Sequence, residues 1–182
     1  MWEVSSNGEF LAAVTAESDT AGSELVVVRL TGELATRRIS AKGQSVCHPT
    51  WSVKGDRIAY AACSANDARL GKGPAARGEL VRNRIWLAEA NGAAAPKALT
   101  SDTRYRDEAP VFSGDGRAVL FCRTDRTGDA YIGSMTDRGT NLRQVSPSFQ
   151  VQPYESGRIQ WGRWVDIKPT PHLTSTRTTG KV

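Results

Sequence analysis

The sequence predicts an all-β fold: a partial β-propeller of four-stranded antiparallel blades, with three complete blades and the start of a fourth. Three observations predict it. A short pattern with a turn glycine occurs three times, and a fragment of it occurs a fourth time. A second apolar run, another turn and a short stretch ending in Ser or Thr follow each complete copy. The copies also recur at about the spacing of propeller blades.

The repeated pattern supplies the first two predicted strands of each blade. The copies are VSSNGEFLAAV from Val4 to Val14, PTWSVKGDRIAY from Pro49 to Tyr60, PVFSGDGRAVLF from Pro110 to Phe121, and the weaker PYESGRIQW from Pro153 to Trp161. Their strand residues are β-branched or aromatic, and Gly, Asn, Asp or Ser interrupt them. This pattern predicts two strands joined by a tight turn.

The next apolar run supplies the third predicted strand. It reads ELVVVRL from Glu24 to Leu30, RIWLAEA from Arg84 to Ala90 and DAYIGS from Asp129 to Ser134. A turn with glycine follows each run. The fourth stretch of each unit ends in a hydroxyl residue, at Ser40, Thr100 and Ser146. None of these units has a sustained helical period, so each is predicted to contain four strands.

The turn glycines give the repeat length. Gly8 and Gly55 are 47 residues apart, Gly55 and Gly116 are 61 apart, and Gly116 and Gly157 are 41 apart. Propeller blades run about 40–50 residues, and an insert at 64–83 accounts for the long middle unit. A four-stranded sheet cannot bury both of its faces alone, so successive units must stack. Radial stacking into a propeller satisfies this requirement.

The second unit carries a family resemblance. PTWSVKGDRIAY, followed by RIWLAEANG and KALT, resembles the TolB-like β-propeller repeat, which reads Pro-x-Trp-Ser-x-x-Gly-x-x-Ile-x-Tyr/Phe, then a strand, Asp/Asn-Gly and Leu-Thr. The resemblance covers about residues 2–161 and is specific for fold, not for function. TolB is a periplasmic partner-binding protein, and similar blades occur in prolyl-oligopeptidase-like enzymes. The resemblance therefore implies a periplasmic or extracytoplasmic location.

The residues of the repeat are predicted to be structural. They are Pro49, Trp51 and Gly55 in one copy and Pro110, Phe112 and Gly116 in the next. We expect the aromatic residues to fill the space between neighbouring blades and the glycines to take positive φ in hairpin turns. The prolines are predicted to start the first strand, where a missing N–H costs little. Ile58 and Tyr60 alternate along the next strand, which predicts one apolar face.

These observations divide the chain into three parts. A partial propeller is predicted at residues 1–164, an inserted surface loop at 64–83, and a disordered tail or linker at 165–182. Within the propeller, the predicted units lie at about 2–40, 49–100, 110–146 and 153–164.

The number of units predicts an open structure. Propellers typically close with four to eight blades, and three blades with part of a fourth leave two apolar blade faces exposed. We therefore expect an arc of a larger propeller, or an arc that closes the ring by self-association. In either case a protein partner is predicted.

The positive charge of the chain, +5 in total, is concentrated in the insert region and in the C-terminal stretch. Residues 64–84 carry a net charge of +3 and residues 158–182 carry +4, so the rest of the chain carries −2. The insert has no aromatic residue on which bases could stack, so nucleic acid is not a predicted partner. A solvated surface loop is the preferred interpretation of the insert, and contact with an anionic partner is the alternative.

Targeting and membrane signals are lacking in the sequence. No apolar run approaches the roughly 20 residues of a transmembrane helix, so no membrane span is predicted. The first residues, MWEVSSNGEF, lack the basic and apolar regions of a signal peptide. Because they begin almost inside a strand, we expect a missing upstream part or a processed or misannotated start.

The best candidates for a ligand or partner site are His48, Asp107 and Glu108. They lie just before the prolines of the second and third units, where propeller residues tend to line the mouth of the central channel. Exposed loop residues are the alternative interpretation. The chain has no Gly-x-Ser-x-Gly, Gly-rich phosphate loop or metal-spaced His pair. No catalytic residue, metal site or cofactor is therefore predicted.

The three cysteines carry little functional signal. Cys47, Cys63 and Cys122 form no Cys-x-x-Cys pair, which removes the sequence support for a zinc or thioredoxin-type site. At most one disulfide can form. Cys63 and Cys122 lie near the ends of equivalent predicted strands, where buried free thiols are common.

Three functional interpretations follow. The preferred one is a non-catalytic propeller module for protein–protein interaction. The alternative is a propeller segment of a larger extracytoplasmic enzyme, of hydrolase, peptidase or redox type, whose catalytic domain is not on this chain. A truncated gene remnant without function is the third. No set of residues here supports chemistry, which favours the binding module, although fold alone is a weak argument for function.

Overall fold

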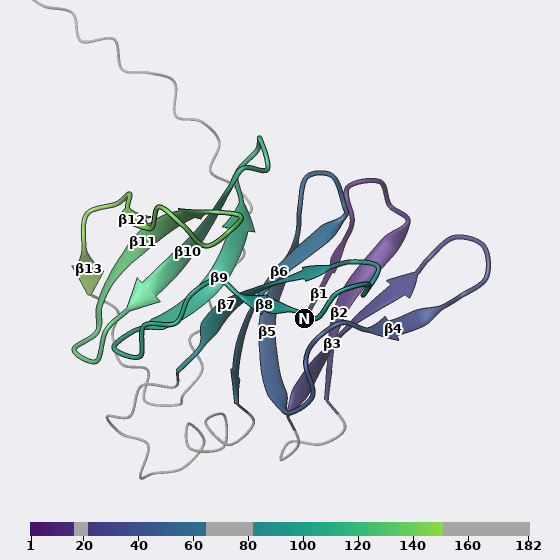
Figure 1. Ribbon diagram of the computed structural model, residues 1–182, viewed down its shortest axis with the longest axis horizontal. Helices are drawn as coiled ribbons and strands as arrows, with labels where there is room; N and C mark the ends of the chain where they lie inside the picture. Colours follow the sequence, from purple (N-terminus) through teal and green to yellow (C-terminus); the bar gives the residue numbers. More distant parts are fainter. Residues whose placement is uncertain (17–21, 65–81, 151–182) are drawn as a thin grey trace, which may run out of the picture.

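The computed structural model describes residues 1–16, 22–64 and 82–150, and within these ranges it contains thirteen strands and no helix. Figure 1 shows the strands as antiparallel sheets packed side by side in chain order, from β1–β4 to β9–β13. The prediction of an all-β fold with four-stranded blades is confirmed. No membrane-spanning helix is found in these ranges. The predicted fourth unit at 153–164, the tail at 165–182 and nearly all of the insert lie outside them.

The first two sheets each contain four strands in sequence order, and all their strand pairs are antiparallel. The first sheet comprises β1 (Trp2–Val4), β2 (Phe10–Ala16), β3 (Ser23–Arg29) and β4 (Thr36–Arg38). The second comprises β5 (Gln44–Trp51), β6 (Arg57–Ser64), β7 (Arg84–Glu89) and β8 (Lys97–Ala98).

The third sheet repeats this order and adds one short strand. It comprises β9 (Arg106–Phe112), β10 (Ala118–Thr124), β11 (Asp129–Thr136), β12 (Arg143–Gln144) and β13 (Phe149–Gln150). β13 pairs with β11, with Phe149 opposite Ala130. This extra pairing, just before the predicted fourth unit, was not predicted from the sequence.

One serine turn joins the first two strands of every sheet. In the second sheet the Gly55 N–H donates to the Ser52 carbonyl at 2.8 Å, and the Arg57 N–H donates to Ser52 Oγ at 3.0 Å. The equivalent side-chain bonds run from Phe10 N to Ser5 Oγ at 3.0 Å and from Ala118 N to Ser113 Oγ at 2.9 Å. Gly55 has φ of 71° and Gly116 has φ of 69°, which confirms the predicted glycine turns.

The hydroxyl residue at the end of each unit also has a repeated role. Ser40 Oγ accepts a hydrogen bond from the Leu25 N–H at 3.0 Å, at the start of β3. Thr100 Oγ1 and Ser146 Oγ accept the same bond from Ile85 N at 3.0 Å and from Ile132 N at 2.9 Å. The fourth stretch of each unit is therefore fastened to the third strand by its last side chain, because the buried N–H there needs a partner.

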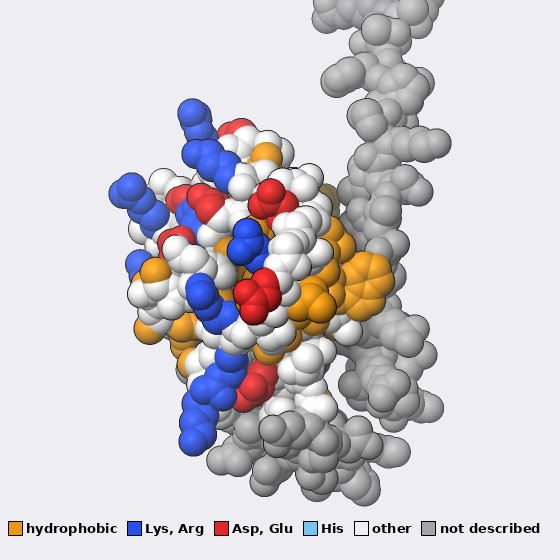
Figure 2. All heavy atoms as spheres, turned by 90° about the vertical axis from the view of Figure 1, so that its right-hand side faces the viewer, with side chains coloured by type: hydrophobic (Ala, Val, Ile, Leu, Met, Phe, Trp, Pro, Cys, Tyr) orange, Lys and Arg blue, Asp and Glu red, His pale blue; other side chains and the backbone are white. Residues whose placement is uncertain are grey.

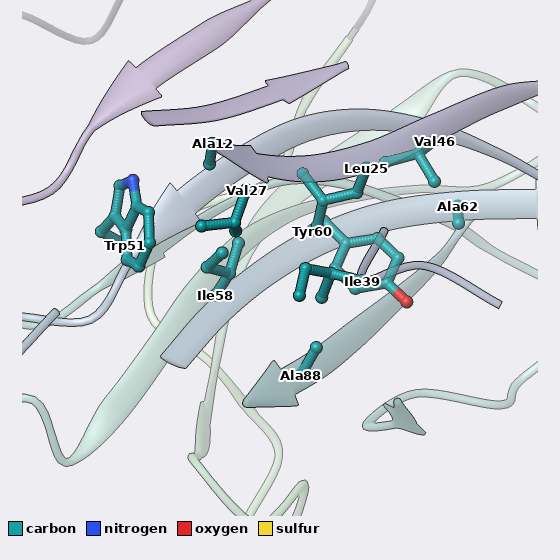
Figure 3. Close-up of a cluster of buried hydrophobic side chains, with 10 residues drawn as sticks. All are labelled: Ala12, Leu25, Val27, Ile39, Val46, Trp51, Ile58, Tyr60, Ala62 and Ala88. Atoms are coloured by element: carbon teal, nitrogen blue, oxygen red, sulfur yellow. The ribbon is translucent and has the colours of Figure 1, made fainter. Parts of the chain in front are cut away.

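The first core lies between the first and second sheets. Figure 3 shows Trp51, Ile58 and Tyr60 of the second sheet near Ala12 and Leu25 of the first. The Trp51 indole N–H donates to the carbonyl of Glu3 in β1 at 3.0 Å. The predicted role of this tryptophan between blades is confirmed: it fills apolar space and joins two sheets.

The second core lies between the second and third sheets. It includes Phe112 and Phe121 from the third sheet and Ala59 and Ala61 from β6. Because the opposite face of β6 belongs to the first core, this strand is buried on both faces from Ile58 to Cys63. The prediction of a single apolar face was therefore incomplete for β6. Its second face carries Ala59 and Ala61, whose small side chains leave room for the rings of Phe112 and Phe121.

The prediction that proline starts the first strand was wrong. β5 begins at Gln44 and β9 begins at Arg106, so Pro49 and Pro110 lie inside these strands. Strand pairing is interrupted between Cys47 and Thr50, and the pairing of β9 with β10 shifts at the matching place. A bulge tolerates proline because it leaves one N–H out of the ladder.

Candidate functional site

The candidate site is built on two neighbouring inner strands, β5 and β9, which contact each other. His48 has φ of 50° and Ala109 has φ of 49°, and each immediately precedes the proline at its bulge. Positive φ is uncommon for residues other than glycine. Side chains of consecutive strand residues normally point to opposite faces, and a bulge changes their direction. The bulge in β5 therefore lets Cys47 and His48 approach the same side chain of β9.

That side chain is Glu108. One ligand-type atom from each of Cys47, His48 and Glu108 lies within 4.8 Å of the other two. Glu108 is 4% exposed, and its Oε1 accepts a hydrogen bond from Asn83 Nδ2 at 2.7 Å. Arg106 Nη2 lies 2.5 Å from the same oxygen. The three residues form what we call the seam cluster, because it joins the inner strands of the second and third sheets.

Burial determines the protonation of the seam cluster. Burial, with a smaller contribution from the charge of Glu108, raises the pKa of the Cys47 thiol far above its usual value. Burial also lowers the pKa of His48, against the opposing influence of Glu108. The thiol is therefore protonated and the imidazole is neutral near pH 7. His48 Nδ1 is buried and has no hydrogen-bond partner in the structure of residues 1–16, 22–64 and 82–150.

Asp107, the third predicted site residue, has a different position. It is fully buried, and its carboxylate accepts two hydrogen bonds from Arg123, from Nε at 2.7 Å and Nη2 at 2.8 Å. The Arg123 guanidinium also lies over the rings of Tyr105 and Phe121, with its central carbon 4.8 and 5.4 Å from their centroids. This closed ion pair holds β9 to β10, so Asp107 does not join the seam cluster.

Sequence reasoning placed His48 and Glu108 at one site and missed Cys47 and Asn83. The signal for Cys47 was its place in the repeat, because it precedes His48-Pro49 as Glu108 precedes Ala109-Pro110. Asn83 carried no such signal, since it was assigned to the end of the inserted loop. Within the part of the chain that the structure describes, the seam cluster is the one group of side chains that could hold a metal ion.

A second candidate surface lies on the outer face of the first sheet. Trp2 pairs with Ala13, and Val4 pairs with Leu11, across β1 and β2. β3 continues these rows, so six apolar side chains share one face: Trp2, Val4, Leu11, Ala13, Val26 and Val28. Trp2 is 63% and Val4 is 41% exposed, and the other four are half-buried. We call this surface the end face; Figure 2 views that side and shows hydrophobic side chains gathered together and bordered by charged ones.

A hollow of about 570 Å³ lies between the first and second sheets, away from both surfaces. Its lining includes Phe10, Arg37, Asp56 and Asn91, from strand ends and turns. The Arg37 side chain donates a hydrogen bond to the carbonyl of Asn91 across this hollow. The charges in its lining are mixed, and its side chains hold the rims of two sheets together, so we do not treat it as the candidate site.

Comparison with known proteins gives matches in structure only. No protein-family model and no curated protein matches the chain. A puromycin-hydrolysing peptidase of Mycobacterium tuberculosis is 16% identical, with a TM-score of 0.57 over 82% of this chain and 22% of the peptidase chain. TolB from Acinetobacter baumannii is 18% identical, with a TM-score of 0.54 over 76% of this chain and 29% of TolB.

The β-propeller domain of the Trilobed protease from Pyrococcus furiosus is also similar, with 15% identity and a TM-score of 0.50 over 84% of this chain and 43% of that chain. These likenesses define the class: the chain is a partial β-propeller. Its fold is TolB-like, as the repeat predicts. The chain spans between 22% and 43% of the length of these three structures.

Proposed function

We propose that this chain is a non-catalytic propeller module that binds protein, as an arc of a larger TolB-like ring. The observation that carries the proposal is the end face, an apolar sheet surface with Trp2 63% exposed. A contiguous apolar patch with an exposed tryptophan is typical of an interaction site.

The expected occupant of the end face is another propeller blade. The second sheet supports this choice, because both of its faces are covered by blades of the same kind. Like those covered faces, the end face is formed by apolar side chains that alternate with the side chains of the opposite face. In a solution of this chain alone, the available blade is that of a second copy.

Charge and chemistry also favour a protein over a nucleic acid. The end face carries six apolar side chains, and the chain outside residues 64–84 and 158–182 has a net charge of −2. Nucleic-acid affinity depends on basic residues that neutralise phosphates. An apolar surface beside a nearly neutral body is better suited to another apolar protein surface.

The test measures mass in solution and the binding of an apolar dye. We expect the wild-type chain to self-associate as its concentration increases, or, if it stays monomeric, to bind the dye. The double variant Trp2→Lys/Val4→Lys should neither self-associate nor bind the dye. Val53→Lys is the matched control, because Val53 is exposed but lies in a turn away from the end face. A wild-type monomer that binds no dye, like the double variant, would overturn the proposal.

A second candidate function is supported by the comparisons. Two of the similar structures belong to a peptidase and a protease, and the chain spans 22% and 43% of them. This chain would then be the propeller segment of a larger extracytoplasmic enzyme whose catalytic domain lies elsewhere. Two observations distinguish the enzyme segment from the binding module: the mass of the endogenous polypeptide and the DNA sequence that flanks the gene. A longer product with a hydrolase domain would favour the enzyme, and a product of this length the binding module.

A further inference from the structure

We propose that Cys47 Sγ, the His48 imidazole and the Glu108 carboxylate bind one divalent transition-metal ion of the Zn²⁺ class. The site lies at the seam between the second and third blades, and its fourth position is left for water or an anion. This proposal is independent of the end face and of protein binding.

The geometry of the seam cluster is close to that of a metal site. Its three ligand-type atoms lie within 4.8 Å of one another. In a tetrahedral zinc site with bonds of about 2.0–2.3 Å, neighbouring ligand atoms are about 3.5 Å apart. The ligand atoms of Cys47 and His48 would have to move closer to the fixed Glu108 carboxylate by roughly 1 Å, a shift that side-chain rotation can supply.

The backbone explains why these residues meet. The bulge that contains His48 redirects the side chains of two consecutive residues, so both can serve one site. β9 has the same bulge, where Ala109 takes the position of His48 and offers no ligand. The two blades therefore contribute unequally, with Cys47 and His48 from one and Glu108 from the other. Backbone strain of this kind is often found at functional sites.

The burial of the cluster also fits a metal. His48 Nδ1 is a buried nitrogen without a hydrogen-bond partner in the described structure, and a buried polar atom of this kind is normally satisfied. A metal ion bound at this nitrogen would supply the missing partner. On binding, the Cys47 thiol would release its proton to solvent and coordinate as the thiolate.

The surroundings of Glu108 resemble a second coordination shell. Asn83 Nδ2 and Arg106 Nη2 both contact Oε1, at 2.7 and 2.5 Å, which fixes the orientation of the carboxylate. A thiolate and a carboxylate balance the charge of a divalent ion, and Arg106 adds one positive charge. The loaded site would therefore be cationic, and an anion is a suitable fourth ligand.

The ligand types narrow the choice of metal. Mg²⁺ and Ca²⁺ prefer oxygen ligands, whereas thiolate and imidazole favour Zn²⁺ and similar ions. The three protein ligands leave one coordination position open, as in catalytic zinc sites. We assign no reaction to the ion.

The test uses the full chain without an affinity tag, stripped with a chelator and titrated with Zn²⁺ and then Co²⁺. We expect one ion per chain and, with Co²⁺, a thiolate-to-metal charge-transfer band. Cys47→Ser should abolish the band, and Glu108→Gln should weaken Zn²⁺ binding at least 10-fold. Cys63→Ser and Glu89→Gln are the matched controls and should keep both signals.

Near-UV circular dichroism shows that each variant is folded. If Cys47→Ser does not fold, His48→Gln tests the same ligand set and should also lose the one-to-one binding of Zn²⁺. Folded wild-type chain that binds no stoichiometric Zn²⁺ or Co²⁺ would overturn the proposal. A charge-transfer band that persists in Cys47→Ser or disappears in Cys63→Ser would also overturn it.

Discussion

Tyr60 is a buried side chain that can ionise, so it links the stability of the fold to pH. Its ring is fully buried in the first core, and its hydroxyl donates to Gln44 Oε1 at 3.2 Å. Burial strongly raises the pKa of this phenol. The folded chain therefore holds its proton at a pH where the unfolded chain releases it.

We expect Tyr60 to make the protein sensitive to alkali. Its contribution to stability is complete below the unfolded pKa of about 10 and is lost as pH rises toward the folded pKa. Tyr60→Phe should be about 1 kcal/mol less stable at pH 8, because the hydrogen bond to Gln44 is lost. Between pH 8 and pH 11 the gap between wild type and variant should narrow by roughly 1 kcal/mol. Urea unfolding at each pH measures this gap, and a constant gap would contradict the argument.

At the scale of the element, the serine turn is the unit that recurs. Ser52 is buried; its Oγ accepts from the Arg57 N–H and donates to Asp56 Oδ1 at 2.7 Å. That hydrogen bond is the main reason why the pKa of Asp56 lies below its usual value. One hydroxyl therefore satisfies a backbone donor and orients the turn carboxylate at the point where β5 passes into β6.

Removal of this hydroxyl should destabilise the chain. Ser52→Ala leaves the Arg57 N–H without its partner, which costs about 1–3 kcal/mol. The control is Ser101→Ala, at an exposed position between β8 and β9, which should change the free energy of unfolding by less than about 0.5 kcal/mol. Chemical denaturation measures both. Equal stabilities for the two variants would show that the serine turn is not needed for the hairpin.

The local elements could be predicted from the sequence because they depend on local chemistry. The turn at Ser52–Gly55 depends only on residues next to one another in the sequence. The burial of Trp51 follows from the size of its apolar side chain. The burial of both faces of β6 depends on which sheets pack against it, so periodicity within one strand could not reveal it. The seam cluster combines residues 47 and 108, and only the packing of β5 against β9 brings them together. The same is true of the closed ion pair that keeps Asp107 away from it.

At the scale of the whole molecule, the three sheets differ in how much of their surface is covered. The second sheet has a core on each face, whereas the outer face of the first sheet carries exposed Trp2 and Val4. In a stacked array, each unit is stabilised by its own strands and by its contacts with neighbours. The second sheet should therefore be the last to unfold locally, and the first sheet should unfold before it.

Hydrogen exchange followed by mass spectrometry tests this order. We expect the amides of β6 to exchange most slowly, those of β2 and β3 faster, and those of the exposed edge strands β4, β8 and β12 fastest. A partner blade bound to the end face should slow β2 and β3 toward the rate of β6, and leave β6 unchanged. Equal protection of β2, β3 and β6 in the isolated chain would instead mean that all three sheets unfold as one cooperative unit. In that case the uncovered face does not lower the local stability of the first sheet relative to that of the second.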